Sequence, residues 1–322
     1  MTATMNEVPA GPRPEWPLVS VVIPTRGRPE LVRETIAAVI AQTYPGEIES
    51  VIVHDQEAPD EDLVNLSVPG RPVRVVANTH TPGLAGARNS GLDHATGAFI
   101  ASCDDDDLFH PDKVEKQVSR MLAEPDLLAV GSGMRLRMPG NRIVDWPGRA
   151  ELIPYDMLLR SRVKELHSST MLIRREAFEQ VGTYDEGVPY GHGEDWDWLL
   201  RAARVGRIGT VTEPLAVIRK DVITSRERWH SGGAQNIVAG LTYMLAKHPD
   251  LASTRKGYAR ILGKIAYAQS QQGNRGEALR YEVRSLTRWP ITPDAYLAIA
   301  HTVTGIHPRH FLRAARRFGR GV

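Results

Sequence analysis

The sequence predicts an α/β fold in which a mostly parallel sheet is flanked by helices and followed by a C-terminal all-helical segment. In the first half of the chain, short apolar runs alternate with segments of helical periodicity, a pattern typical of βαβ units. From about residue 235 onward only helical patterns remain, separated by short turns that contain proline or glycine. We therefore expect a disordered lead-in over 1–17, an α/β domain over 18–234 and a helical segment over 235–322.

The individual elements follow from apolar periodicity and capping signals. We predict that the first helix begins at Pro29, because Val32 and Ile36 start an apolar stripe behind a proline at the first helical position. Asp112 followed by Glu115 resembles a capping box and predicts another helix start. The predicted strands cover 18–23, 49–53, 73–77, 98–103, 127–131, 167–174, 208–211 and 215–218. The other predicted helices cover 84–95, about 196–203, 235–247, 254–271, 275–288, 293–303 and 308–318.

The composition is that of an ordinary globular protein. Of the 322 residues, 42% are hydrophobic and 24% are charged, and the formal net charge of +2 is too small to indicate nucleic acid as the main partner. Cys103 is the single cysteine, which excludes an internal disulfide and fits a reducing compartment. No run approaches the roughly eighteen apolar residues of a membrane span, and 1–17 lacks the apolar core of a signal peptide. We expect a cytoplasmic protein.

The most informative stretch joins a predicted strand to a run of consecutive carboxylates, Asp104 to Asp107. Like charges at one strand end repel one another, so we expect a positive partner, and hard oxygen ligands at this density suit Mg²⁺ or Mn²⁺. The i, i+2 spacing of Asp104 and Asp106 predicts these two as metal ligands. The alternative is a solvated acidic turn that helps to cap the helix near Asp112. His230 is predicted as a further metal or phosphate contact, with a surface histidine as the alternative.

Polar residues also follow other predicted strands, at the carboxyl edge of the sheet where α/β folds bind ligands. Pro24 and Thr25 follow the first strand, and Asp55 follows the second. Asp55 could accept a hydrogen bond from a nucleobase N–H, or it could serve a turn. Arg88 is on a predicted helix of small residues, where it could pair with a phosphate or with the acidic run, or lie on the surface.

Glu194 and Asp195 open a predicted helix directly after a glycine-rich turn at 190–193. Carboxylates at this position commonly do no more than complement the helix dipole. Asp195 borders the apolar stripe of this helix, with Leu199 one turn on, so we expect its side chain to face inward. A carboxylate that faces a cleft suits general-base work on a hydroxyl, and we predict that role for Asp195.

Taken together, these motifs resemble those of the family 2 inverting glycosyltransferases, which have the GT-A fold. The resemblance extends over about 18–230 and follows the family's order. It is carried by the opening strand and turn (19–25), His54-Asp55, the Ala-Arg-Asn helix (86–91), the acidic segment with its trailing Pro-Asp (104–112) and Gly193-Glu194-Asp195. His54 stands where an aspartate is common in the family.

The resemblance implies a single displacement at an anomeric carbon, with inversion and with Asp195 as the base. A divalent ion on Asp106, assisted by Asp104, would stabilise the departing nucleoside diphosphate. Glu194 and His167 are predicted on the acceptor side, and the acceptor itself stays open among a saccharide, a lipid-linked sugar and a small metabolite. The donor would be a nucleoside-diphosphate sugar, with uridine diphosphate favoured, held by Pro24, Thr25, Asp55, Arg88 and Asp105.

Two other functions remain alternatives at the level of sequence. A nucleotidyltransferase on a similar sheet would need a glycine-rich signature with a lysine near the first strand, which residues 25–28 do not supply well. A non-catalytic binding protein would keep the fold without needing Asp104, Asp106 and Asp195 together.

The C-terminal end carries a basic amphipathic pattern within the predicted helix 308–318. Its arginines occur without an acidic residue among them, and Phe311, Leu312 and Phe318 would share the other face. Such a helix can rest on an anionic surface, here the inner membrane face, which would suit a lipid-linked acceptor. Packing of its apolar face on the preceding helices is the alternative. A homodimer through the helical segment also stays open.

Overall fold

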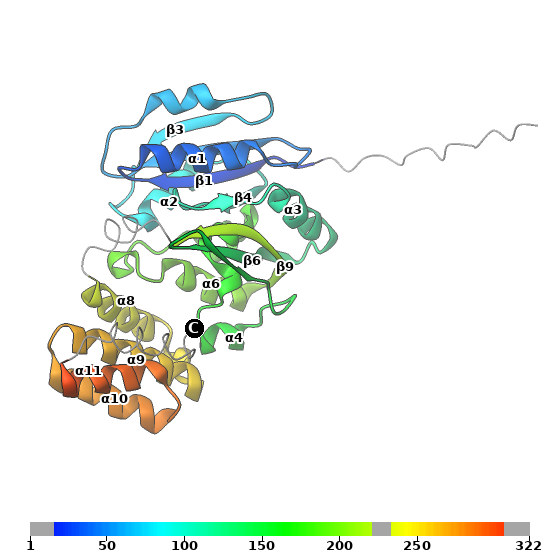
Figure 1. Ribbon diagram of the computed structural model, residues 1–322. Coiled ribbons are helices and arrows are strands. Elements are labelled where there is room, and N and C mark those ends of the chain that lie inside the picture. The colour runs from blue at the N-terminus through cyan, green and yellow to red at the C-terminus, as the bar shows by residue number, and fades with distance from the viewer. Residues whose placement is uncertain (1–15, 221–232, 306–322) are drawn as a thin grey trace, which may run out of the picture.

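The computed structural model describes residues 16–220 and 233–305. Within them a single mixed sheet has the strand order β3-β2-β1-β4-β8-β6-β9-β5, and β7 pairs with β6 (Figure 1). The strands are β1 Val19–Thr25, β2 Ile48–His54, β3 Val73–Ala77, β4 Phe99–Ser102, β5 Leu108–Phe109, β6 Leu127–Met138, β7 Arg142–Trp146, β8 Leu172–Arg174 and β9 Arg207–Arg219. The α-helices are α1 Pro29–Ile40, α2 Leu84–His94, α3 Lys113–Ala123, α4 Tyr155–Arg160, α5 Arg175–Val181, α6 Glu194–Val205, α8 Ala234–Lys247, α9 Arg255–Gln271, α10 Arg275–Arg288 and α11 Pro293–Thr304.

The first half of the sheet is parallel, which confirms the prediction. β1 pairs in parallel with β2 on one side and with β4 on the other, and β2 pairs in parallel with β3. Separate cores cover the two faces, one with Ile36 of α1 and Val118 of α3, the other with Ala87 of α2 and Leu199 of α6. The carboxyl ends of β1, β2 and β4 therefore meet at one edge of the sheet, where the polar residues of the motifs follow them.

The second half of the sheet differs from the predicted strands. β8 is shorter than predicted, because 168–170 form a 3₁₀ turn instead of the start of a strand. The strands predicted at 208–211 and 215–218 are one strand, β9, whose pairing with β6 shifts register around Gly133. The polar residues Thr212 and Glu213 interrupt the apolar pattern at this point, which is why the sequence predicted two strands instead of one. The sequence did not predict β5, which has two residues, or β7, whose largely exposed side chains give no apolar signal.

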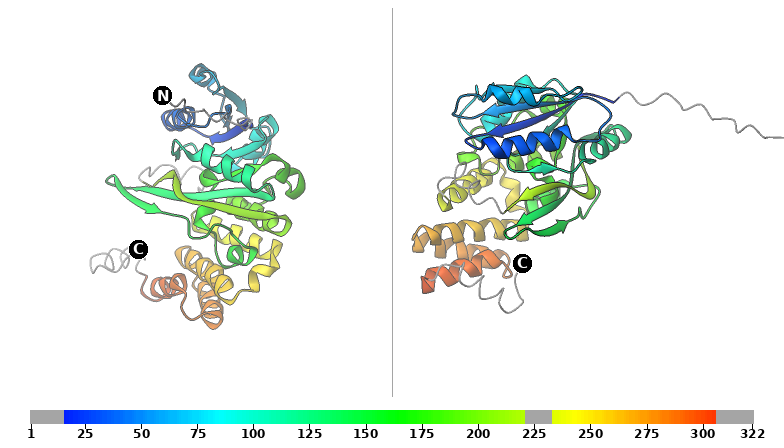
Figure 2. Two further views of the ribbon diagram at one scale, coloured as in Figure 1. Left: turned by 90° about the vertical axis from the view of Figure 1, so that its right-hand side faces the viewer. Right: turned by 45° about the horizontal axis from the view of Figure 1, so that its top comes forward.

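The helices α8–α11 pack together beside the sheet and form the predicted all-helical segment (Figures 1 and 2). This segment also contacts the α/β part closely: a Cβ added to Gly257 of α9 would lie 2.2 Å from the carbonyl oxygen of Leu159. Among the described residues, no helix combines the length and the apolar character needed to cross a membrane. The predicted helix at 308–318 and residues 1–15 of the predicted lead-in lie outside the described residues.

Candidate active site

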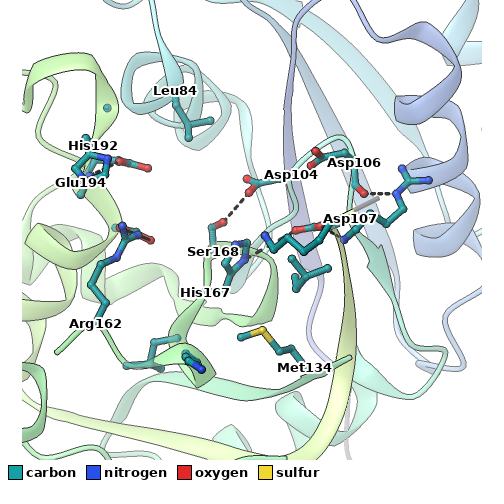
Figure 3. Close-up of a pocket in the computed structure, with 18 of the residues that line it drawn as sticks. Leu84, Asp104, Asp106, Asp107, Met134, Arg162, His167, Ser168, His192 and Glu194 are labelled. Atoms are coloured by element: carbon teal, nitrogen blue, oxygen red, sulfur yellow. Dashed lines mark hydrogen bonds and ion pairs between the residues drawn. The ribbon is translucent and has the colours of Figure 1, made fainter. Parts of the chain in front are cut away.

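A cleft of about 1220 Å³ opens at the carboxyl edge of the sheet (Figure 3). One wall is the acidic turn, Asp104–Asp107, which follows β4, and the opposite wall carries His192 and Glu194 at the start of α6. Residues from α8 and α9 complete the lining, so the α/β part and the helical segment share the cleft. Apolar side chains form part of the lining: Met134, Leu136, Met138, Trp146, Val163, Leu166 and Ile218.

The carboxylates of the acidic turn alternate between greater and lesser exposure. The side chains of Asp104 and Asp106 are 26% and 14% exposed. The side chain of Asp105 is 2% exposed and accepts hydrogen bonds from Thr25 Oγ1 at 2.8 Å and from Arg28 Nη1 at 2.6 Å. Burial raises the pKa of Asp105 to about 6, although Arg28 acts in the opposite direction. The pair predicted to bind a metal is thus the more exposed pair of the turn.

Asp107 and His167 lie beside Asp104. One potential ligand atom from each of these three side chains lies within 4.8 Å of the other two. Burial lowers the pKa of His167 to about 4, so its ring is neutral near pH 7 and able to coordinate a metal. Burial and the charges of Asp104 and Asp106 raise the pKa of Asp107 well above its ordinary value, a repulsion that a cation would offset. Clustered carboxylates are the ligands that Mg²⁺ and Mn²⁺ prefer, so these residues fit such an ion.

Arg88 connects the two walls of the cleft. Its guanidinium is buried and donates from Nη2 to Asp104 Oδ1 at 2.9 Å and from Nη1 to Glu194 Oε1 at 2.5 Å. Burial disfavours its charge, but Asp104 and Glu194 outweigh burial and raise the pKa of Arg88. In return, Arg88 lowers the pKa of Asp104 below its ordinary value in spite of burial. Of the alternatives left by the sequence, pairing with the acidic run is the one that the structure shows.

Asp195 lies in the first turn of α6, on the wall opposite the acidic turn. Its two carboxylate oxygens accept hydrogen bonds from Arg162 Nη2 at 2.7 and 2.5 Å. Burial would raise the pKa of Asp195, but Arg162 and Arg88 outweigh burial and hold the pKa below its ordinary value. The carboxylate is therefore ionised near neutral pH and lines the cleft, two properties that a general base requires.

Some residues predicted to hold the donor lie beneath the cleft surface. Pro24 lines the cleft, whereas Thr25 is 1% exposed and Asp55 is 0% exposed. The carboxylate of Asp55 accepts hydrogen bonds from Asn78 Nδ2 at 2.7 Å and from the backbone N–H of Gly83 at 3.2 Å. In this structure Asp55 therefore holds the loop that leads into α2.

Two predicted histidines and three arginines that were not predicted remain to be placed relative to the cleft. His167, predicted on the acceptor side, lies beside the acidic turn, and His230 lies outside the described residues. Sequence reasoning missed three arginines that line the cleft: Arg28, Arg162 and Arg219. Arg28 follows the first strand closely, so its position at the ligand-binding edge could have identified it. Arg162 and Arg219 belong to segments without a motif, and tertiary packing alone brings them to the site.

Curated relatives are similar to part of this chain. An uncharacterized glycosyltransferase of Rickettsia felis is 28% identical over 202 residues, which cover 59% of this chain and 32% of the relative. The UDP-Glc:alpha-D-GlcNAc-diphosphoundecaprenol beta-1,3-glucosyltransferase WfgD of Escherichia coli is 32% identical over 105 residues, which cover 33% of this chain and 41% of that protein. The chain spans less than two thirds of the length of the first curated relatives that it matches.

Solved structures share the fold over most of the chain. A mannosyltransferase of Pyrobaculum calidifontis, solved in complex with GDP-Man and Mn²⁺, superimposes on this chain with a TM-score of 0.56 at 19% sequence identity. The superposition covers 95% of this chain and 85% of the mannosyltransferase chain. This likeness shows the GT-A type of fold, with the helical segment added at the C-terminal end. The family model described as glycosyl transferase family 2 matches residues 20–182, just over half of the 322 residues. The chain therefore belongs to glycosyl transferase family 2.

Proposed function

We propose that this protein is a metal-dependent inverting glycosyltransferase, which moves a sugar from a nucleoside-diphosphate sugar to an acceptor hydroxyl. The observation that carries the proposal is the position of Asp195, an ionised carboxylate on the wall that faces Asp104 and Asp106. An inverting displacement needs a proton acceptor on one side of the anomeric carbon and the leaving group on the other. The two walls of this cleft supply suitable residues for both.

Asp195 would accept the proton of the acceptor hydroxyl while the hydroxyl oxygen forms the new glycosidic bond. The bond between the anomeric carbon and the diphosphate would break on the opposite face, so the anomeric configuration would invert. Arg162 would orient the carboxylate of Asp195, since its Nη2 contacts both oxygens. Glu194 would act through Arg88, which it holds against the acidic turn.

Asp104 and Asp106 would hold the divalent cation, Mn²⁺ or Mg²⁺, because they are the more exposed pair of the acidic turn. Asp107 and His167 also lie close to Asp104, and these three residues are the alternative ligand set. The bound cation would supply Lewis-acid stabilisation of the negative charge on the departing diphosphate. The other donor contacts are proposed for Pro24, Arg88 and Asp105, which line the cleft. Thr25 and Asp55 lie beneath the cleft surface, so we propose that they hold the donor indirectly, Thr25 through Asp105 and Asp55 through the loop before α2.

The nucleotide base is the open part of the donor assignment. We favour a uridine diphosphate sugar, since the name of the Escherichia coli relative specifies UDP-Glc as its donor. The Pyrobaculum structure, in contrast, holds GDP-Man, so similarity of fold is compatible with either base.

Calorimetric titration tests the donor site directly. Uridine, deoxythymidine and guanosine diphosphates would each be titrated with and without Mn²⁺. We expect one of them to bind at least about tenfold more tightly with the metal. If the folded protein binds none of them, the donor assignment is wrong and the non-catalytic alternative gains support.

The variant Asp195→Asn tests the proposed base. It should bind the nucleoside diphosphate with unchanged affinity and lose at least about a hundredfold in transfer rate, because the proton acceptor is removed while the acidic turn stays intact. Asp126→Asn is the control, since Asp126 is an exposed carboxylate that pairs with Arg207 away from the cleft lining. Transfer at the wild-type rate by Asp195→Asn would rule out Asp195 as the base.

A further inference from the structure

Asn236, in the first turn of α8, is a buried amide without a hydrogen-bond partner among the described residues. The residue is part of the cleft lining, yet it is only 2% exposed. Neither Nδ2 nor Oδ1 has a partner among the residues that the structure describes. Buried polar groups are normally hydrogen-bonded, because desolvation without a partner costs free energy. An unsatisfied amide on the wall of a cleft therefore indicates a ligand that supplies the missing partners.

Within residues 16–220 and 233–305, the other buried amide side chains have hydrogen-bond partners, which sets Asn236 apart. Gln117 Nε2 donates to the carbonyl oxygens of Val130 at 2.9 Å and Thr170 at 2.8 Å. Asn89 Nδ2 donates to the carbonyl oxygen of Tyr184 at 2.9 Å. These amides join parts of the protein to one another, whereas the side chain of Asn236 makes no such hydrogen bond to any residue that the structure describes.

The packing of α8 places Asn236 on the wall that carries Asp195. A Cβ added to Gly240 would lie 2.6 Å from the carbonyl oxygen of His192, so α8 rests directly on the loop that precedes Glu194. Asn236 is four residues before Gly240 and therefore on the same face of the helix. Its amide thus belongs to the acceptor side of the proposed site, not to the acidic turn.

We propose that Asn236 binds hydroxyl groups of a saccharide acceptor and so makes the helical segment part of the acceptor site. This inference rests on the proposed function. An amide presents one donor group and one acceptor group, and a sugar hydroxyl can both donate and accept. A phosphate or carboxylate would leave Oδ1 without a donor, and an ammonium group would leave Nδ2 without an acceptor. Paired hydroxyls satisfy both atoms.

The variant Asn236→Leu separates binding from a structural role, because leucine has a similar size and carries no polar atom. The unliganded variant should melt at or above the wild-type temperature, since it removes an unsatisfied buried group. Its affinity for an acceptor saccharide should fall at least about tenfold, while nucleotide affinity stays unchanged. Asn236→Ala should show the same loss of saccharide affinity.

Gln117→Met is the matched control for a buried amide that does serve the fold. It should melt at a lower temperature than wild type, because the carbonyl groups of Val130 and Thr170 lose their donor. Saccharide affinity of the folded control protein should stay at the wild-type value.

The probes are methyl glycosides of glucose, galactose, mannose and N-acetylglucosamine, titrated by ligand-observed NMR into protein loaded with Mn²⁺ and the nucleoside diphosphate that binds best. Equal affinity of wild type and Asn236→Leu for the glycosides would overturn the inference. So would binding of nucleotide but of none of the glycosides by wild type, or a melting temperature of Asn236→Leu as low as that of Gln117→Met. Failure of wild type to bind any nucleoside diphosphate would instead overturn the proposed function.

Discussion

Arg88 lies between Asp104 and Glu194, with its guanidinium 2.9 Å from the first carboxylate and 2.5 Å from the second. The two acids come from opposite walls of the cleft, the acidic turn after β4 and the first turn of α6. One buried cation therefore sets the spacing between the proposed metal site and the proposed base. Arg88, on the small-residue helix α2, thus holds together two carboxylates that lie far apart in the sequence.

Removal of Arg88 should destabilise the fold. Arg88→Met would leave Glu194 buried without its cation, and breaking a buried ion pair in this way costs about 3–5 kcal/mol. Arg88→Lys should cost less, because a lysine keeps the charge but cannot donate to both carboxylates through a planar fork. The free energy of unfolding in urea measures both effects. An unchanged urea midpoint for Arg88→Met would contradict this account of the pair.

The metal ligands can be told apart by substitution within the acidic turn. Asp104→Asn and Asp106→Asn should each remove the Mn²⁺ dependence of nucleotide binding, because each deletes a charged ligand of the more exposed pair. Asp107→Asn should retain it, since Asp107 already accepts hydrogen bonds from Ser169 Oγ at 2.6 Å and from the backbone N–H of Arg219 at 3.2 Å. Calorimetry with and without Mn²⁺ gives the answer.

The opposite result would identify a different ligand set. If Asp107→Asn and His167→Ala lose the Mn²⁺ dependence while Asp106→Asn keeps it, the ion is held by Asp104, Asp107 and His167, whose ligand atoms lie within 4.8 Å of one another.

Arg162 should control the acid side of the pH–rate profile. Arg162 lowers the pKa of Asp195 against the effect of burial, so Arg162→Met should raise that pKa. Since the base works only when ionised, the fall in kcat/KM on acidification should begin at a higher pH in the variant. Arg160→Met is the control, because Arg160 pairs with Asp156 outside the cleft lining. Superimposable profiles for Arg162→Met and wild type would refute the coupling.

Lys113 should make stability depend on pH. It is fully buried on α3, where Nζ donates to Gln117 Oε1 at 2.8 Å and lies 4.0 Å from the centroid of the Phe109 ring. Burial lowers the pKa of Lys113 from 10.5 to about 7, so between these values the unfolded chain binds a proton that the folded chain does not. Stability then rises with pH in that window, by up to about 1.4 kcal/mol per pH unit.

The variant Lys113→Met removes this contribution. Urea unfolding of wild type and variant at several pH values between 7 and 10 measures it. The difference in unfolding free energy, wild type minus variant, should increase with pH. A difference that is flat across this range would show that Lys113 keeps its ordinary pKa.

Local patterns were sufficient for the first half of the fold. β3 has the predicted bounds, and α2 ends within one residue of its prediction, because alternating strands and helices of this kind follow apolar periodicity. The second half of the sheet was harder to predict from the sequence. β9 contains a register shift against β6, and β7 is exposed, so neither leaves a continuous apolar signal.

By itself the sequence determined where the carboxylates of the proposed site lie along the chain: Asp104 and Asp106 just after β4, and Asp195 at the start of α6. These positions depend on strand ends and helix starts, which nearby residues decide. Only the tertiary structure decided which side chains lie next to these carboxylates. Arg162 contacts Asp195, Arg88 contacts an acid on each wall, and α8 adds Asn236 to the cleft lining. Such contacts join residues from separate elements, and only the packing of those elements sets the distances on which charge and hydrogen bonding depend.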